Sequence, residues 1–141
     1  MVAVGIIAVQ QGGSVWRLPL VFCVAMAAGA ALASAGVATL AVEPLVAASV
    51  VVLGCLIASA HAIPFACATP PVAVLAVFHG VAHGIEQPAG VTWMALAGLL
   101  CATAILHCSG VFTAHALRTR VRLAGTPLVV TGAWLVGRAL M

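Results

Sequence analysis

Charged side chains are nearly absent from this chain of 141 residues. Only 5% of the residues are charged, Lys and Asp do not occur, and Glu occurs twice. Soluble domains carry charge on about a quarter of their residues. The sequence is instead 65% hydrophobic, with a mean hydropathy of +1.32. These values exclude an ordinary soluble domain and predict an integral membrane protein.

Catalytic motifs are also missing. The chain has no Gly-x-Ser-x-Gly, no His-Glu-x-x-His and no glycine-rich phosphate loop. An intramembrane hydrolase would need a Ser and His dyad, but Ser109 follows His107 by two positions and so lies on another side of the same helix. We therefore expect a protein that is not an enzyme.

Cysteine gives no sign of a disulfide or a redox centre. The five cysteines are odd in number, lie inside apolar stretches and form no Cys-x-x-Cys motif. Buried free cysteine behaves as a small hydrophobic residue, and we interpret all five in this way.

Long uncharged stretches predict the fold. Residues 18–42, 44–85 and 87–117 lack any charge, and a spanning helix needs roughly 20 apolar residues. The prediction is an all-α, polytopic transmembrane helix bundle in one domain, 1–141, with about five spans plus a partial N-terminal helix. The expected helices are, in approximate bounds, 2–10, 18–40, 44–59, 63–83, 92–117 and 123–139.

The charges predict how the helices alternate. Four helices separate Arg17 from the three arginines of residues 118–122, so these two loops should face the same side. Positive residues favour the cytoplasmic side. Glu43 and Glu86 then lie on the opposite side, together with the N-terminus. Arg138, near the C-terminus, is the one residue that departs from this pattern.

Two local patterns concern helix packing. Ala25, Gly29, Ala33 and Gly36 recur at small-xxx-small spacing, which predicts a face where another helix approaches closely. The pair Pro70-Pro71 lies inside the helix expected over 63–83, and we expect it to kink that helix.

The candidate site is an ionisable trio in an apolar context. At 100° per residue, His79, His83 and Glu86 lie within about a 60° arc of one helix, and the two histidines are about 6 Å apart along its axis. Two imidazoles and a carboxylate suit a divalent cation such as Ni²⁺, Zn²⁺ or Co²⁺. Gly80 and Gly84 leave room beside them for a helix or an ion. The alternative is that these side chains merely sit at the headgroup region.

Other ionisable residues could extend this site. His107 falls near the middle of an expected helix, so it should face the bundle interior and find a partner there. We interpret it as a second metal station. Glu43 is a possible vestibule residue on the side of the trio, although a helix N-terminus also favours a carboxylate. His61 and His115, near the inner helix ends, are interpreted as interfacial residues.

With these residues in hand, the chain resembles the HupE/UreJ family of small membrane proteins. The specific part of the resemblance is Phe78-His79-Gly80-Val81-Ala82-His83-Gly84-Ile85-Glu86. Weaker parts are the turn at residues 10–13, Leu18-Pro19-Leu20, Val42-Glu43-Pro44 and residues 102–107. In that family the first helix opens with a motif of His, Pro, Gly, Asp and His ahead of the Met that stands here as Met1, so we expect that metal motif to be absent from this chain.

The resemblance implies a function. It implies a membrane permease or accessory protein for Ni²⁺, with Co²⁺ as the second candidate ion, in a bacterial inner membrane. It also implies service to hydrogenase or urease maturation proteins, no permanently bound cofactor and no nucleic-acid partner. The alternative hypothesis is a non-transporting scaffold, or an inactive truncated remnant of the family, whose histidines only stabilise helix packing.

Overall fold

The computed structural model describes residues 1–37, 41–59, 63–87 and 92–141, apart from the side chains of Arg118 and Thr119. Within these ranges the chain is helical, and the expected all-α membrane bundle is confirmed. Backbone groups in lipid have no water to bond, so helices are the structures that satisfy them within one segment. The elements are α1 Val2–Gln10, α2 Arg17–Ser34, α3 Val42–Ala58, α4 Phe65–Ile85, α5 Trp93–Leu117, a 3₁₀ helix Arg118–Ala124, and α6 Gly125–Ala139.

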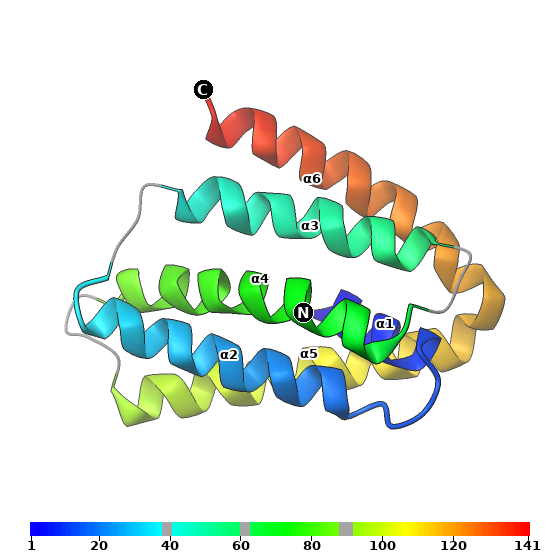
Figure 1. Cartoon of the computed structure of the whole chain (residues 1–141), viewed down its shortest axis with the longest axis horizontal. Helices are drawn as coiled ribbons and strands as arrows, with labels where there is room; N and C mark the ends of the chain where they lie inside the picture. The colour runs from blue at the N-terminus through cyan, green and yellow to red at the C-terminus, as the bar shows by residue number, and fades with distance from the viewer. Residues whose placement is uncertain (38–40, 60–62, 88–91) are drawn as a thin grey trace.

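Among the described residues, three helices are long and apolar enough to cross a membrane, namely α2, α4 and α5. Helix α3, with 17 residues, is apolar and slightly shorter. Figure 1 shows the long helices side by side, with α3 and α6 forming one edge and α5 the other. Helix α1 is different because it begins near the middle of the bundle and ends at one of its ends (Figure 1).

The most extensive contacts join α2 to α4, α3 to α6 and α1 to α5. Glycine makes the first of these pairs possible. A Cβ atom on Gly29 of α2 would collide with the carbonyl oxygen of Val77 on α4, and one on Gly80 of α4 would collide with that of Met26 on α2. The two backbones therefore touch where side chains would otherwise hold them apart. The sequence analysis allowed either a helix or an ion in the space beside Gly80. In the structure, helix α2 fills this space.

The other two pairs use the same device. Gly5 of α1 lies against the carbonyl oxygen of His107, and Gly110 of α5 lies against that of Val2. In the third pair a Cβ on Gly125 of α6 would come within 2.6 Å of the Gly54 oxygen on α3. Each major interface thus contains a glycine from both of its helices.

Helix α2 ends earlier than the sequence predicted, at Ser34 rather than near residue 40. Gly36 has a φ of +85°, the amide of Val37 donates to the Leu32 carbonyl and that of Gly36 to the Ala33 carbonyl. This pattern is a Schellman motif, which closes a helix with glycine in the left-handed conformation. Gly36 therefore terminates α2 and is not part of its packing face, and residues 38–40 lie outside the described ranges.

Three prolines lie near the starts of helices. Pro19, Pro44 and Pro127 lie in the first turns of α2, α3 and α6, where a missing N–H costs little. Pro70 and Pro71 lie inside α4, which nevertheless runs unbroken from Phe65 to Ile85 (Figure 1). The pair does not end the helix, and the expected kink stays a prediction.

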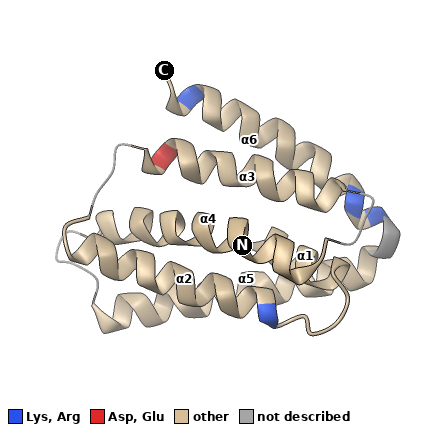
Figure 2. Ribbon diagram, in the orientation of Figure 1, with Lys and Arg blue, Asp and Glu red and all other residues tan. Residues whose placement is uncertain are grey.

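The charged residues confirm the predicted alternation. Arg17 begins α2 and Arg122 lies in the 3₁₀ helix, whereas Glu43 lies in the first turn of α3 and Arg138 in the last turn of α6. Figure 2 shows the first two of these helix ends at one end of the bundle and the other two at the opposite end. Glu86 follows α4 at this second end. We call them the Arg end and the Glu end. Arg17 also places its guanidinium over the Phe65 ring, 4.1 Å from the centroid, which joins the starts of α2 and α4.

A substitution at one glycine tests this packing. We expect Gly29→Ala to lower the free energy of unfolding by about 1–3 kcal/mol, because the new Cβ must push α4 away. The matched control is Gly98→Ala, at an exposed position of α5 where a Cβ would meet nothing within 4 Å. Thermal unfolding in detergent measures both. Equal melting temperatures for the two variants would contradict the close approach.

Candidate metal site

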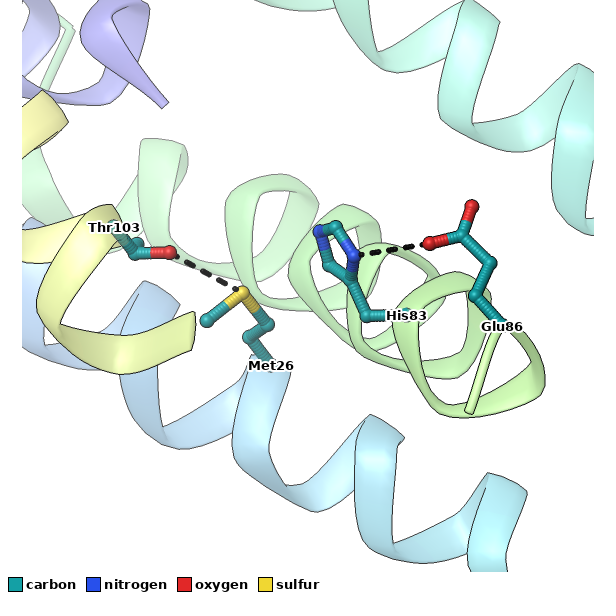
Figure 3. Close-up of polar contacts among 4 residues, drawn as sticks. All are labelled: Met26, His83, Glu86 and Thr103. Carbon is teal, nitrogen blue, oxygen red and sulfur yellow. Dashed lines mark hydrogen bonds and ion pairs between the residues drawn. The ribbon is translucent and has the colours of Figure 1, made fainter. Parts of the chain in front are cut away.

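The outermost part of the site is a contact between a histidine and a carboxylate at the end of α4. His83 Nδ1 lies 3.4 Å from the Glu86 carboxylate, three positions along the chain (Figure 3). Both side chains are accessible, with exposed fractions of 41% and 71%. His83 also lines a small pocket of about 40 Å³ with Gln87 and residues of α2 and α5. The pair is therefore within reach of a cation arriving at the Glu end.

His79 lies one turn deeper in α4 and is half-buried. Its Nδ1 lies 3.0 Å from the carbonyl oxygen of Leu75 in the preceding turn. The side chain lines the large cavity of the bundle and does not join the His83–Glu86 pair. The two histidines thus share a helix face but belong to different surroundings.

The large cavity has a volume of about 580 Å³ and lies among α1, α3, α5 and α6. Its wall is mostly apolar. The polar side chains on it are His79, Ser49, Thr113 and Thr131, and its far wall includes Ala124, next to the start of α6 at the Arg end. The cavity is therefore bordered both by His79 and by residues at the start of α6.

His107 faces the interior of the bundle, as its position in the sequence predicted. Its exposed fraction is 1%, and its Nδ1 lies 2.9 Å from the carbonyl oxygen of Met1. Its other ring nitrogen, Nε2, is buried and has no hydrogen-bond partner. The partner of this histidine is thus the main-chain carbonyl of Met1, the residue before α1, which no feature of the sequence identifies.

The hydrogen bonds fix the proton on these two rings. A carbonyl oxygen only accepts, so the nitrogen that faces it must carry the hydrogen, and the proton of His79 and of His107 is on Nδ1. In the neutral imidazole, Nε2 of each ring then presents a lone pair. Metal-binding histidines usually donate their second N–H to a carbonyl or carboxylate in this way, which sets the tautomer and the ring orientation.

Phe22 of α2 contacts both half-buried His79 and buried His107. Its ring centroid lies 5.8 Å from that of His79 and 5.2 Å from that of His107, and both pairs meet edge to face. The sequence analysis missed this residue. Its spacing carried a signal, since Phe22, Met26 and Gly29 recur at i, i+4 and i+7 and so share one face of α2.

The remaining candidates lie elsewhere. Glu43 is exposed and lines a pocket of about 440 Å³ with Trp134 and Arg138 of α6, apart from the histidines. Arg138, which departs from the charge pattern, thus shares a pocket with a carboxylate. His115 is exposed in the last turn of α5, and His61 lies outside the described residues.

Among the residues that the structure describes, no three His, Cys, Asp or Glu side chains converge on one point. The trio of His79, His83 and Glu86 is therefore divided into a pair and a separate histidine, and its metal-binding role stays a prediction. All five cysteines are free. Ser109 donates to the Ile105 carbonyl on the exposed side of α5, away from buried His107.

Comparisons with known proteins agree with this architecture. The family model described as HupE / UreJ protein matches residues 1–135. Protein HupE of Rhizobium leguminosarum bv. viciae is 40% identical over 144 residues, which cover 96% of this chain and 75% of that protein. No solved structure gives a significant match. The chain therefore belongs to the HupE/UreJ family of membrane proteins.

Proposed function

We propose that this protein is a permease or accessory protein for nickel uptake, with cobalt as the second candidate ion, that supplies hydrogenase or urease maturation in a bacterial inner membrane. The family is associated with nickel and cobalt supply to these enzymes. The observation that carries the proposal is the hydrogen bonding of two imidazoles, half-buried His79 and buried His107. His79 and His107 each donate Nδ1–H to a carbonyl and keep the Nε2 lone pair for a ligand.

The route begins at the Glu end. The Glu86 carboxylate and the His83 ring attract a hydrated cation at the 40 Å³ pocket. His79, one turn deeper, takes the ion from this pair at the wall of the large cavity. Imidazole nitrogen suits Ni²⁺ and Co²⁺, whereas Mg²⁺ and Ca²⁺ prefer oxygen ligands. A histidine route therefore selects borderline metals over the abundant hard cations.

The cavity continues the route toward the Arg end. Its hydroxyl groups, on Ser49, Thr113 and Thr131, offer oxygen atoms to the ion or to its waters between long apolar stretches. His107 acts as a second station behind Met1. An ion held by one or two neutral nitrogens at a time binds weakly enough to leave, which passage through a membrane requires.

A second candidate function is a non-transporting scaffold. The favouring observation is that each of the three histidines already has a partner within the protein for its Nδ1 atom. Two of them also pack against Phe22. Under this hypothesis the imidazoles hold helices together and bind no ion. Metal uptake and folded yield separate the two functions.

Histidine removal tests the permease. In cells lacking their own nickel importer, this chain should raise ⁶³Ni accumulation above the empty vector, and His79→Ala/His83→Ala should return it to the vector level because the imidazole ligands are gone. The matched control is Cys101→Ala, an exposed position on α5, which should retain uptake at the same membrane level. Unchanged uptake in the double variant would refute the histidine route. If the unsubstituted protein shows no uptake above the vector and the double variant has a lower folded yield, the scaffold hypothesis would be favoured.

The exposed carboxylate allows function to be separated from stability. We expect Glu86→Gln to change the free energy of unfolding by less than about 0.5 kcal/mol, because a surface ion pair with these exposures is screened by solvent. Nickel uptake at low concentration should nevertheless fall, since capture loses its negative charge. Thermal unfolding and concentration-dependent uptake check the two parts. A KM for nickel equal to that of the unsubstituted protein would contradict a capture role.

A further inference from the structure

Phe22 occupies the most enclosed position of the histidine region. Its exposed fraction is 1%, and it is the largest of the fully buried side chains among the described residues. One turn further along α2, the sulfur of Met26 accepts a hydrogen bond of 3.7 Å from the Thr103 hydroxyl of α5 (Figure 3). Phe22 meets His107 and Met26 meets Thr103, so α2 and α5 are in register over two successive turns.

Each of the two histidines is otherwise held at a single polar atom. The Leu75 carbonyl fixes Nδ1 of His79, and the Met1 carbonyl fixes Nδ1 of His107. A ring that makes one hydrogen bond can still tilt while that hydrogen bond is kept. The contact with Phe22 limits this freedom because aromatic rings prefer edge-to-face arrangements, and the interplanar angles here are 65° and 82°.

The shared contact has a mechanical consequence. Protein interiors are close-packed, so a buried ring shifts only when its neighbours shift with it. His79 borders a cavity and has space to turn, whereas Phe22 and His107 are enclosed. A reorientation of His79 must therefore displace the Phe22 ring or lose its contact, and a displaced Phe22 ring changes the contact with His107.

We propose that Phe22 is a positioning residue that couples the orientations of His79 and His107. In the setting of the proposed function, on which this part rests, ion binding at His79 would reorient that ring and, through Phe22, prepare His107 to receive the ion. The coupling passes through one aromatic ring on a helix that carries no histidine.

The coupling can be measured without transport. In purified protein carrying isotope-labelled histidine, the ring resonances of His107 are recorded by NMR with and without His79→Gln. We expect His79→Gln to shift the His107 resonances, and we expect this shift to be lost when the same change is made in the Phe22→Leu protein. Leu fills most of the space but has no ring to transmit the change.

The control is Leu18→Ala, one turn earlier on α2 and equally buried in the same core. The His107 shift should persist in that background. Phe22→Met, a flexible apolar replacement, serves as a second ringless variant if Phe22→Leu folds poorly. A His107 shift of equal size with and without the Phe22 ring, or no shift in either background, would overturn the coupling.

Uptake kinetics then test its role in transport. Phe22→Leu should lower the maximal rate of nickel uptake per folded molecule by roughly 2- to 10-fold, the effect of one aromatic contact, with KM unchanged because the capture pair is intact. An unaltered maximal rate would overturn the role of Phe22 in transfer. Absence of nickel uptake by the unsubstituted protein would instead refute the proposed function, and the NMR result would still decide the coupling.

Discussion

The fold depends on the close approach of helix backbones at glycine. Apolar side chains gain little by leaving lipid for a protein interior, so helices in a membrane associate through dense packing at short range. In this chain glycines of both partners meet at each of the three largest interfaces, where they lie against main-chain oxygen atoms. A single methyl group at Gly5, Gly29 or Gly80 would separate the backbones. The distances between the helices therefore depend on the absence of side chains at these positions.

The histidine region follows from the same contacts. Gly29 and Gly80 bring α2 onto α4, and this approach lets Phe22 reach His79. Gly5 and Gly110 bring α1 onto α5, which places the Met1 carbonyl at His107 Nδ1. The orientation of each imidazole thus depends on a glycine contact elsewhere along its helix. Changes at these glycines should therefore alter the positions of the histidine rings.

The sequence predicts features that depend on composition and on spacing along one helix. Hydropathy predicts the all-α membrane bundle, loop parity predicts the two ends of Figure 2, and the mid-helix place of His107 predicts its burial. It does not predict features that depend on partners from other helices. The spacing predicted that Gly36 belongs to a packing face, whereas in the structure it ends α2. Spacing alone cannot distinguish a glycine that another helix packs against from a glycine that ends its own helix. The separation of His79 from His83 and the contacts of His79 and His107 with Phe22 likewise arise only in the folded bundle.

The unpartnered nitrogen of His107 is the strongest physical argument that this region serves more than packing. A buried polar atom without a hydrogen bond costs about 1–3 kcal/mol. A Leu or Met side chain could fill a similar volume at this position without that cost, while the Met1 carbonyl would keep the bond that it accepts from the Val4 amide. Packing alone therefore favours an apolar residue there. At His107 the Nδ1 proton is donated to the Met1 carbonyl, and the Nε2 lone pair is buried without a donor. This arrangement lowers the stability of a protein whose histidines only pack, but it suits a residue that binds a cation.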